Sequence, residues 1–213
     1  MSAPAALAVS KISYPETEES PTATGKKGAY DIPPSDDVNV FHAACNGAVI
    51  GTMLVLNIAG NLIAFLAIIE MLDQLIIYLG ARVDIVVSFN ILCELFFYPI
   101  AWLMGVDPAD CRAIAGVIGY KIFANEFVAY EILAFQIRDS ISDRSFYIAS
   151  YALAGFSNFS SIGIQLGGLT PLAPEQGPKL AKLVLSAMIA GNTACFMTAC
   201  IAGIFYVSPD TAE

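Results

Sequence analysis

The chain contains 213 residues, of which 57% are apolar and 14% are charged, and its formal net charge is −9. Soluble globular proteins average about 45–50% apolar and about 25% charged residues, so this composition excludes a soluble enzyme and indicates a polytopic membrane protein. Three long stretches contain no Lys, Arg, Asp or Glu, namely residues 38–69, 145–174 and 183–209. Each is longer than the run of about 18 apolar residues that predicts a membrane span.

The negative charge is concentrated in polar segments. Residues 14–43 carry six acidic residues against Lys26 and Lys27, and Asp210 and Glu213 add two more negative charges. This composition favours a solvated linker over a docking surface for a cationic partner. The sequence contains no basic patch, which argues against nucleic-acid binding.

Metal and hydrolase chemistry have little support in the sequence. The five cysteines show no CxxC pair and no metal-ligand spacing, and His42 is the sole histidine. No metal site and no cofactor are therefore expected. No nucleophile–base pair is visible, which disfavours an intramembrane enzyme, and we expect a function other than catalysis.

The first segments of the chain are a short apolar stretch and a polar one. Residues 1–13 are too short to span a membrane and lack the basic region of a signal peptide. They are expected to be the tail of a preceding transmembrane helix that the chain does not contain. The Pro-rich, acidic residues 14–43 predict a polar linker, and the positive-inside rule, by a small margin, places this linker in the cytosol.

The first complete span is predicted over residues 44–69. Gly47 and Gly51 form a GxxxG pair, and Asn57 and Asn61 lie on one helical face. Small residues and amides on one stripe favour close helix packing over a direct ligand role.

Residues 85–104 allow two interpretations. The segment is apolar enough to span, but Glu94 lies in its middle, Pro99 lies in its last turn, and aromatic residues crowd one end. These features equally permit a helix that lies in the membrane interface. The residues alone leave both possibilities open.

Residues 107–138 predict a re-entrant helical hairpin. Two half-length apolar runs, 113–118 and 127–137, are each too short for a span. The residues expected to break the helix between them are Gly119, Tyr120, Lys121 and Asn125. Irregular backbone at membrane depth is tolerated only where it is buried in protein or lines a cavity, so a site is expected near this break. Lys121 is expected to pair with an acid.

A broken span is predicted over residues 145–170, because Gly155 and Gly163 bracket the polar stretch F-S-N-F-S-S-I. Transporters build discontinuous helices of this kind around their substrates. Residues 180–207 predict the last span, which an acidic tail over 208–213 follows.

Glu126 is the strongest single candidate for a site residue. An acid at membrane depth costs about 2.5–3.5 kcal/mol and normally faces a partner or a cavity, so Glu126 could bind substrate hydroxyls, hold a proton or ion, or bond a neighbouring helix. Asn158 and Ser161 share one helical face and could bind a sugar-like polyol or bond neighbouring helices. Glu94 and Glu131 are weaker alternatives.

Five blocks of the sequence strongly resemble the concentrative nucleoside transporters. The blocks are Y-P-E-T-E-E-S at 14–20, L-N-I-A-G-N-L-I-A-F-L-A at 56–67, N-E-F-V-A-Y at 125–130, G-F-S-N-F-S-S-I-G-I at 155–164 with G-G-L at 167–169, and T-A-C-I-A-G-I at 198–204. The N-E-F-V-A-Y and G-F-x-N-x-x-S-I-G-I blocks, in this order and spacing, are the most specific. The resemblance covers nearly all of the chain and is closer to animal members than to bacterial ones.

The resemblance implies a sodium- or proton-driven nucleoside symporter that works by an elevator-like mechanism. The implied fold is an all-α membrane protein with a re-entrant helical hairpin and a discontinuous helix, which together form one half of an inverted-repeat transporter. The resemblance also implies an external interfacial helix over 85–104, a homotrimer held by scaffold helices that include the first full span, and a plasma-membrane location. The substrate contacts that it implies are Glu126, Phe156, Asn158 and Ser161, of which the Glu, Asn and Ser side chains mainly hold the ribose.

The earlier, inverted half of the family has no counterpart in this sequence. That half carries its own re-entrant hairpin with a G-Q-[ST]-E motif and most of the sodium and base contacts. Residues 44–207 are therefore expected to form the C-terminal transporter domain, with the sodium sites in the absent half. The alternative is a truncated membrane protein that does not transport and has a structural or regulatory role.

Overall fold

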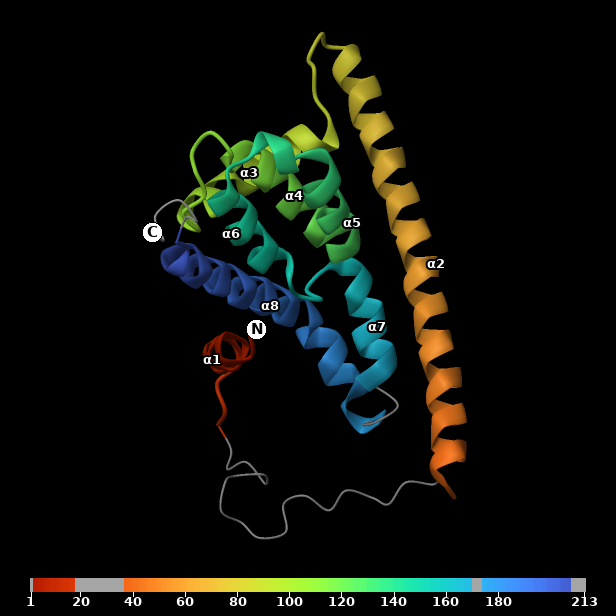
Figure 1. Ribbon diagram of the computed structural model, residues 1–213. Coiled ribbons are helices and arrows are strands. Elements are labelled where there is room, and N and C mark those ends of the chain that lie inside the picture. The colour runs from red at the N-terminus through yellow and green to blue at the C-terminus, as the bar shows by residue number, and fades with distance from the viewer. Residues whose placement is uncertain (1, 18–36, 170–173, 208–213) are drawn as a thin grey trace.

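The computed structural model describes residues 2–17, 37–169 and 174–207, and all regular secondary structure within these ranges is helical (Figure 1). The α-helices are α1 (Ala3–Ser13), α2 (Val40–Ala81), α3 (Phe89–Leu103), α4 (Cys111–Phe123), α5 (Glu126–Glu131), α6 (Asp143–Leu153), α7 (Phe159–Leu169) and α8 (Gly177–Phe205). This confirms the predicted all-α class. Most of the predicted linker, the tail over 208–213 and the side chains of Asn57 and Asn61 lie outside the described residues.

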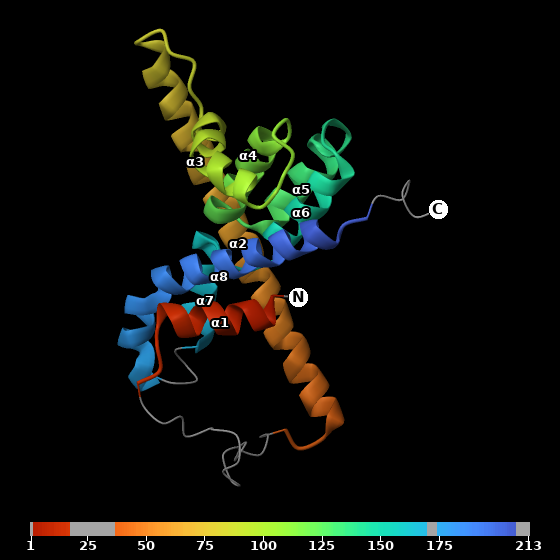
Figure 2. The same cartoon turned by 90° about the vertical axis from the view of Figure 1, so that its left-hand side faces the viewer.

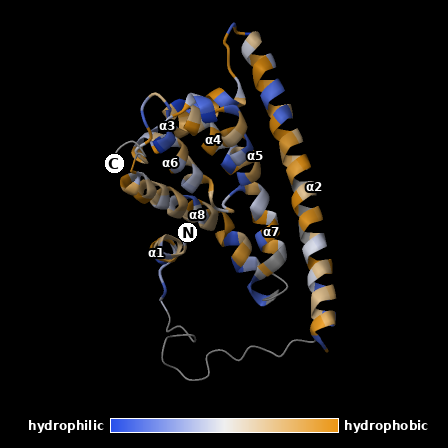
Figure 3. Cartoon of the chain, in the orientation of Figure 1, coloured by the Kyte–Doolittle hydropathy of each residue, from blue (hydrophilic) through white to orange (hydrophobic). Residues whose placement is uncertain are grey.

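Among the described residues, α2 and α8 are the two helices that are long and apolar enough to cross a membrane. The 42 residues of α2 extend for about 63 Å at 1.5 Å per residue, which exceeds the roughly 40–45 Å of a whole bilayer. The helix contains the stretch predicted over 44–69 but begins earlier and ends later. It lies along the outside of the other helices, where it contacts α3 and α7 (Figure 1), and it is hydrophobic along most of its length (Figure 3). A helix with such exposed apolar sides is suited to lipid or to further protein.

The core of the molecule lies where α3 packs against α4. Cys93, Phe97 and Ala101 of α3 are buried, while Phe96 and Trp102 on its other side are exposed. The 15 residues of α3 cover only about 22 Å, which is shorter than the roughly 30 Å hydrocarbon core of a bilayer. This length favours the interfacial interpretation of the segment over a span.

A helical hairpin follows, with α4 as its first arm and α5 as the start of its second. The second arm continues as a π-helical turn over Ile132–Gln136 and a 3₁₀ turn over Arg138–Ser140. The chain reverses at Ala124 and Asn125, and the Asn125 side chain caps α5 by accepting from the backbone N–H of Val128 at 3.0 Å.

The break therefore occurs later than the sequence predicted. The expectation that Gly119, Tyr120 and Lys121 interrupt the helix is wrong, because α4 runs unbroken to Phe123. Gly119 is instead the point at which α4 meets α3, since a Cβ at this position would overlap Cβ and Sγ of Cys93. Its small size serves close packing and not a turn.

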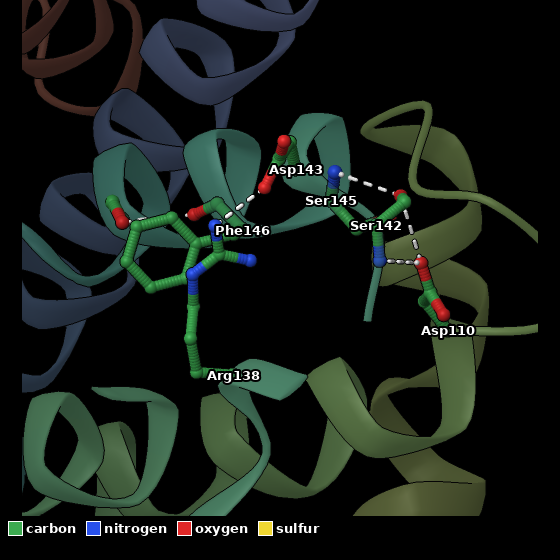
Figure 4. Close-up of polar contacts among 7 residues, drawn as sticks. Asp110, Arg138, Ser142, Asp143, Ser145 and Phe146 are labelled. Carbon is green, nitrogen blue, oxygen red and sulfur yellow. Dashed lines mark hydrogen bonds and ion pairs between the residues drawn. The ribbon is translucent and has the colours of Figure 1, made fainter. Parts of the chain in front are cut away.

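The two ends of the hairpin are fastened to the start of α6 (Figure 4). Ser142 donates to Oδ2 of Asp110 from its backbone N–H at 3.0 Å and from its hydroxyl at 2.9 Å, and its Oγ caps α6 by accepting from the N–H of Ser145. On the second arm, Arg138 forms an ion pair with Asp143, and its guanidinium lies 4.4 Å from the centre of the Phe146 ring. The hairpin is thus anchored at its base, and its tip lies at the other end.

Helices α6 and α7 are two halves of one interrupted helix, separated by residues 154–158. Helix α8 packs against both halves, and α1 packs along α8 (Figure 2). The tip of the hairpin contacts this same interruption through Lys121 and Glu126. The discontinuous helix and the hairpin of the predicted fold class are both present.

Gly119→Ala is expected to lower the melting temperature of the chain purified in detergent. The added methyl group overlaps Cys93, and overpacking of this kind costs about 1–3 kcal/mol, or roughly 2–12 °C for a chain of this size. Gly47→Ala is the matched control, because its new methyl group meets nothing within 4 Å. An unchanged melting temperature for Gly119→Ala would contradict the close approach of α3 and α4.

Asp110 lies in the turn before α4, outside the candidate spans, and is expected to make stability depend on pH. Burial raises the pKa of its carboxyl, but hydrogen bonds from Ser145 and Ser142 lower it by more, so the pKa lies below its ordinary value. A lowered folded-state pKa means that the carboxylate contributes stability above the unfolded-state value of about 3.9. This stability is lost as the pH falls through the folded-state pKa.

The measurement is the melting temperature of wild type and Asp110→Asn from pH 7 to pH 3. The variant is expected to melt several degrees lower at pH 7, with a difference that shrinks below about pH 4. Asp139→Asn, which changes an exposed acid near the same end of the hairpin, is the control. A wild-type–variant difference that stays constant down to pH 3 would refute the role of the Asp110 charge.

Candidate functional site

The tip of the hairpin meets the interruption between α6 and α7 through two side chains. The Asn158 amide donates from Nδ2 to Oε2 of Glu126 at 2.7 Å. Its Oδ1 accepts from the backbone N–H of Ser161 at 2.7 Å, which caps the first turn of α7. The exposed fractions of Glu126, Asn158 and Ser161 are 7%, 0% and 4%, so these groups are held in a site from which most water is excluded. The three residues that the sequence proposed for hydroxyl binding are brought together.

The local sequence explains this arrangement. Asn158 ends the interruption and directly precedes Phe159, the first residue of α7, and an asparagine in this position satisfies one of the free backbone donors of the next helix. Glu126 is the first residue of α5, immediately after the reversal at Asn125. Each residue therefore sits at a helix start, where side chains of two interrupted helices can meet in an apolar environment.

A cavity of about 450 Å³ lies beside the interruption, between α7, α8 and α1. Phe156, Asn158 and Ser161 line it, together with Gln165 one turn further along α7. Its volume falls within the roughly 300–1,000 Å³ that is usual for small-molecule sites. Glu126 is not on the cavity wall, because it contacts Asn158 from the hairpin side.

Ser161 differs from Asn158 in its available bonding capacity. Both polar ends of the Asn158 amide are engaged by Glu126 and the Ser161 backbone, whereas the Ser161 hydroxyl makes no hydrogen bond to any described residue. A hydroxyl that lines a cavity in this state can both donate to and accept from a ligand. The Phe156 ring is 59% exposed and lies edge-to-face with Phe127 at 6.5 Å between ring centres, so it offers an apolar surface near the tip of the hairpin.

The two rival acids lie in other surroundings. Glu94 accepts from Asn90 and pairs with Arg112 on the α3–α4 side of the molecule. Glu131 is exposed at the end of α5. Neither contacts the interruption.

A second set of contacts joins the hairpin to the interruption, and the sequence did not reveal it. Lys121 is 0% exposed and donates from Nζ to Oγ of Ser157 at 2.7 Å and to Oδ1 of Asn192. Asn192 in turn donates from Nδ2 to the backbone oxygen of Ser157 at 2.8 Å. The expected pairing of Lys121 with an acid is wrong, because within the described ranges no carboxylate lies at ion-pair distance from it.

The only sequence signal for this second set was a lysine inside an apolar run. Its partners lie 36 and 71 residues further along the chain. At such separations neither helical periodicity nor local motifs relate one residue to another.

Comparison with known proteins identifies relatives over nearly the whole chain. Residues 1–203 match the family model described as the C-terminus of the Na⁺-dependent nucleoside transporters. Solute carrier family 28 member 3 of Rattus norvegicus is 45% identical over 224 residues, which cover 98% of this chain and 32% of that protein. Sodium/nucleoside cotransporter 2 of the same species is 41% identical, with 100% of this chain and 34% of that protein covered.

Solved structures show the same likeness in three dimensions. A variant of CNTnw in an intermediate state superposes with a TM-score of 0.83 at 32% identity, over 96% of this chain and 49% of that one. CNTnw in an inward-facing, substrate-bound state superposes with a TM-score of 0.76 at 32% identity, over 90% of this chain and 45% of that one. The chain thus spans about a third of the length of the curated relatives and about half of the solved ones.

These matches confirm the resemblance that the N-E-F-V-A-Y and G-F-x-N-x-x-S-I-G-I blocks indicated. The relatives are membrane transporters and not enzymes by their descriptions. The chain belongs to the family of sodium-dependent nucleoside transporters and corresponds to the C-terminal part described by the family model.

Proposed function

We propose that this chain supplies the ribose-binding half of a sodium-coupled nucleoside symporter. One observation carries the proposal: the hairpin tip and the helix interruption bring Glu126, Asn158 and Ser161 together beside a cavity. The free Ser161 hydroxyl and the second oxygen of the Glu126 carboxylate suit a ligand with adjacent hydroxyl groups, because each ribose hydroxyl both donates and accepts. The names of the relatives, sodium/nucleoside cotransporters among them, agree with this substrate class.

The roles of the individual side chains follow from their bonding state. Ser161 offers the hydroxyl that no described residue occupies, and it makes the direct contact with a ribose hydroxyl. Glu126 fixes the Asn158 amide through one oxygen and keeps its other oxygen for a second hydroxyl when the hairpin tip adjusts to substrate. Phe156 packs its exposed ring against the nucleoside. A polar group left unpaired in such a site costs about 1–3 kcal/mol, so the site favours substrates that carry both hydroxyls.

The site belongs to a sodium-coupled, trimeric transporter of the plasma membrane. The coupling ion is sodium, bound outside this chain's described residues, and the transporter resides in the plasma membrane with residues 14–43 on the cytosolic side. The long helix α2 is the scaffold element through which the assembly forms a homotrimer, since many of its described apolar side chains are exposed.

The experiment is uptake of labelled uridine, with and without a sodium gradient, in cells that make the chain in two forms. One form is the chain alone. The other is a chimaera in which the chain replaces the segment that it matches in rat solute carrier family 28 member 3. Sodium-dependent uptake by the chimaera supports the proposal, and its absence despite surface expression refutes it. Uptake by the chain alone decides whether the chain needs a second half.

Glu126→Gln in the chimaera is expected to lower uridine uptake at least about tenfold while surface expression persists. The amide keeps the size of the side chain but removes a charge-assisted hydrogen bond, which contributes about 1.5–3 kcal/mol. Glu131→Gln is the matched control, because it makes the same change on the exposed side of α5 and should leave uptake unchanged. Wild-type uptake by Glu126→Gln would overturn the assignment of this residue.

Ser161→Ala is expected to raise the uridine concentration for half-maximal uptake roughly tenfold. The same change should alter the uptake of 3′-deoxyuridine or of 2′-deoxyuridine much less, because one of these analogues lacks the hydroxyl that Ser161 binds. Ser160→Ala, which removes the neighbouring hydroxyl outside the cavity wall, is the control. Equal losses for uridine and both deoxy analogues would show that Ser161 does not contact the ribose.

A further inference from the structure

Lys121 is a fully buried cation in the middle of the helical body. Its side chain is 0% exposed, and Nζ lies among Oγ of Ser157, Oδ1 of Asn192 and the ring of Phe196, whose centre is 5.9 Å away. The desolvation cost of an ammonium group in such surroundings amounts to several kcal/mol. A residue this unfavourable requires compensation from fixed dipoles and from a nearby negative charge.

The dipoles come from acceptors that are themselves held in place. Ser157 donates from Oγ to Oδ1 of Asn192 at 3.1 Å, while Nδ2 of Asn192 donates to the backbone oxygens of Ser157 at 2.8 Å and Met188 at 3.1 Å. The two oxygens that receive the ammonium therefore come from the interruption and from α8.

The negative charge is Glu126, on the other arm of the same hairpin. No direct ion pair joins it to Lys121, and the two side chains bond the interruption separately. Lys121 bonds Ser157, and Glu126 bonds Asn158. A positive and a negative side chain, one on each side of the hairpin tip, thus bond two consecutive residues of the interruption.

We propose that Lys121 is a covalently tethered cation whose positive charge balances the negative charge of Glu126 across the hairpin tip. Lys121 is also a positioning residue: it holds Ser157 while Glu126 holds Asn158, and together they fix the part of the interruption that a ligand contacts. The assignment of a ligand at this point rests on the proposed function, whereas the charge balance is a property of the folded chain. The balance makes the interruption electrically neutral, so this half of the site requires no free cation to stabilise Glu126.

A double-mutant cycle on the purified full chain tests the balance without any transport assay. Its members are wild type, Lys121→Gln, Glu126→Gln and the double variant, and the measurement is the melting temperature in detergent. Glutamine removes the charge at each position and keeps a polar end group; it matches glutamate in size but is shorter than lysine, so the double variant and the Lys121→Arg variant separate the loss of charge from the loss of length. Each single variant should melt at least about 5 °C below wild type, because it leaves one buried charge uncompensated. The double variant should melt above the lower single variant, since neither charge remains.

The alternative to charge balance is a purely structural hydrogen-bonding role for Lys121, and the cycle separates the two. Additive losses in the double variant, or a Lys121→Gln variant as stable as wild type, would overturn the proposal. Where a single variant fails to fold, recovery of folded protein in the double variant supports it, and failure of the double variant as well refutes it.

Two further variants complete the test. Lys121→Arg, which keeps the charge, should melt closer to wild type than Lys121→Gln does. Lys121→Gln combined with Glu131→Gln should melt no higher than Lys121→Gln alone, because Glu131 is exposed and its charge needs no buried partner. Every measurement in this test is a melting temperature, so its outcome does not depend on transport. A failure of the charge balance can therefore be told apart from a failure of the proposed transport function.

Discussion

The helix interruption between α6 and α7 is the feature on which the remaining structure depends. Backbone donors and acceptors released by a broken helix cannot be left unpaired in an apolar environment, so neighbouring side chains must bond them. Asn192 of α8 donates to the backbone oxygen of Ser157, and Asn158 accepts from the backbone N–H of Ser161. These amides are buried because the interruption needs them. The hairpin tip also bonds Ser157 and Asn158, so the contacts that satisfy the broken helix also hold the candidate site residues in place.

Precise placement of the tip requires rigidity at the other end of the hairpin. Gly119 lets α4 approach α3 closely, and the bonds between Asp110 and Ser142 fasten the base of the first arm to α6. Arg138 fastens the base of the second arm to Asp143 of the same helix. With its base held, the hairpin delivers Lys121 and Glu126 to positions set by packed helices and not by a free loop.

The sequence predicted the fold class because its signals are local and strong. Long stretches without charge indicated the spans, half-length apolar runs indicated the hairpin, and Asn158 with Ser161 followed from helical spacing. The hairpin break was predicted to begin too early, because Gly119 looked like a helix breaker when read alone, although it serves contact with Cys93. Of the four residues predicted for the break, only Asn125 lies at the reversal. The partners of Lys121 could not be predicted, because Ser157 and Asn192 become its neighbours only through packing of distant helices. Local pattern thus predicted residues that the structure brings together, while the contacts of Lys121 depend on tertiary packing.

The paired charges at the hairpin tip have a consequence for the energy of movement within a membrane. Moving one uncompensated elementary charge through a potential of 100 mV requires about 2.3 kcal/mol. Because Lys121 and Glu126 lie on one hairpin, the pair would contribute no net gating charge in a transport cycle that changed the depth of the hairpin. In a transport cycle built around this hairpin, this pair of charges would move with almost no net electrical work.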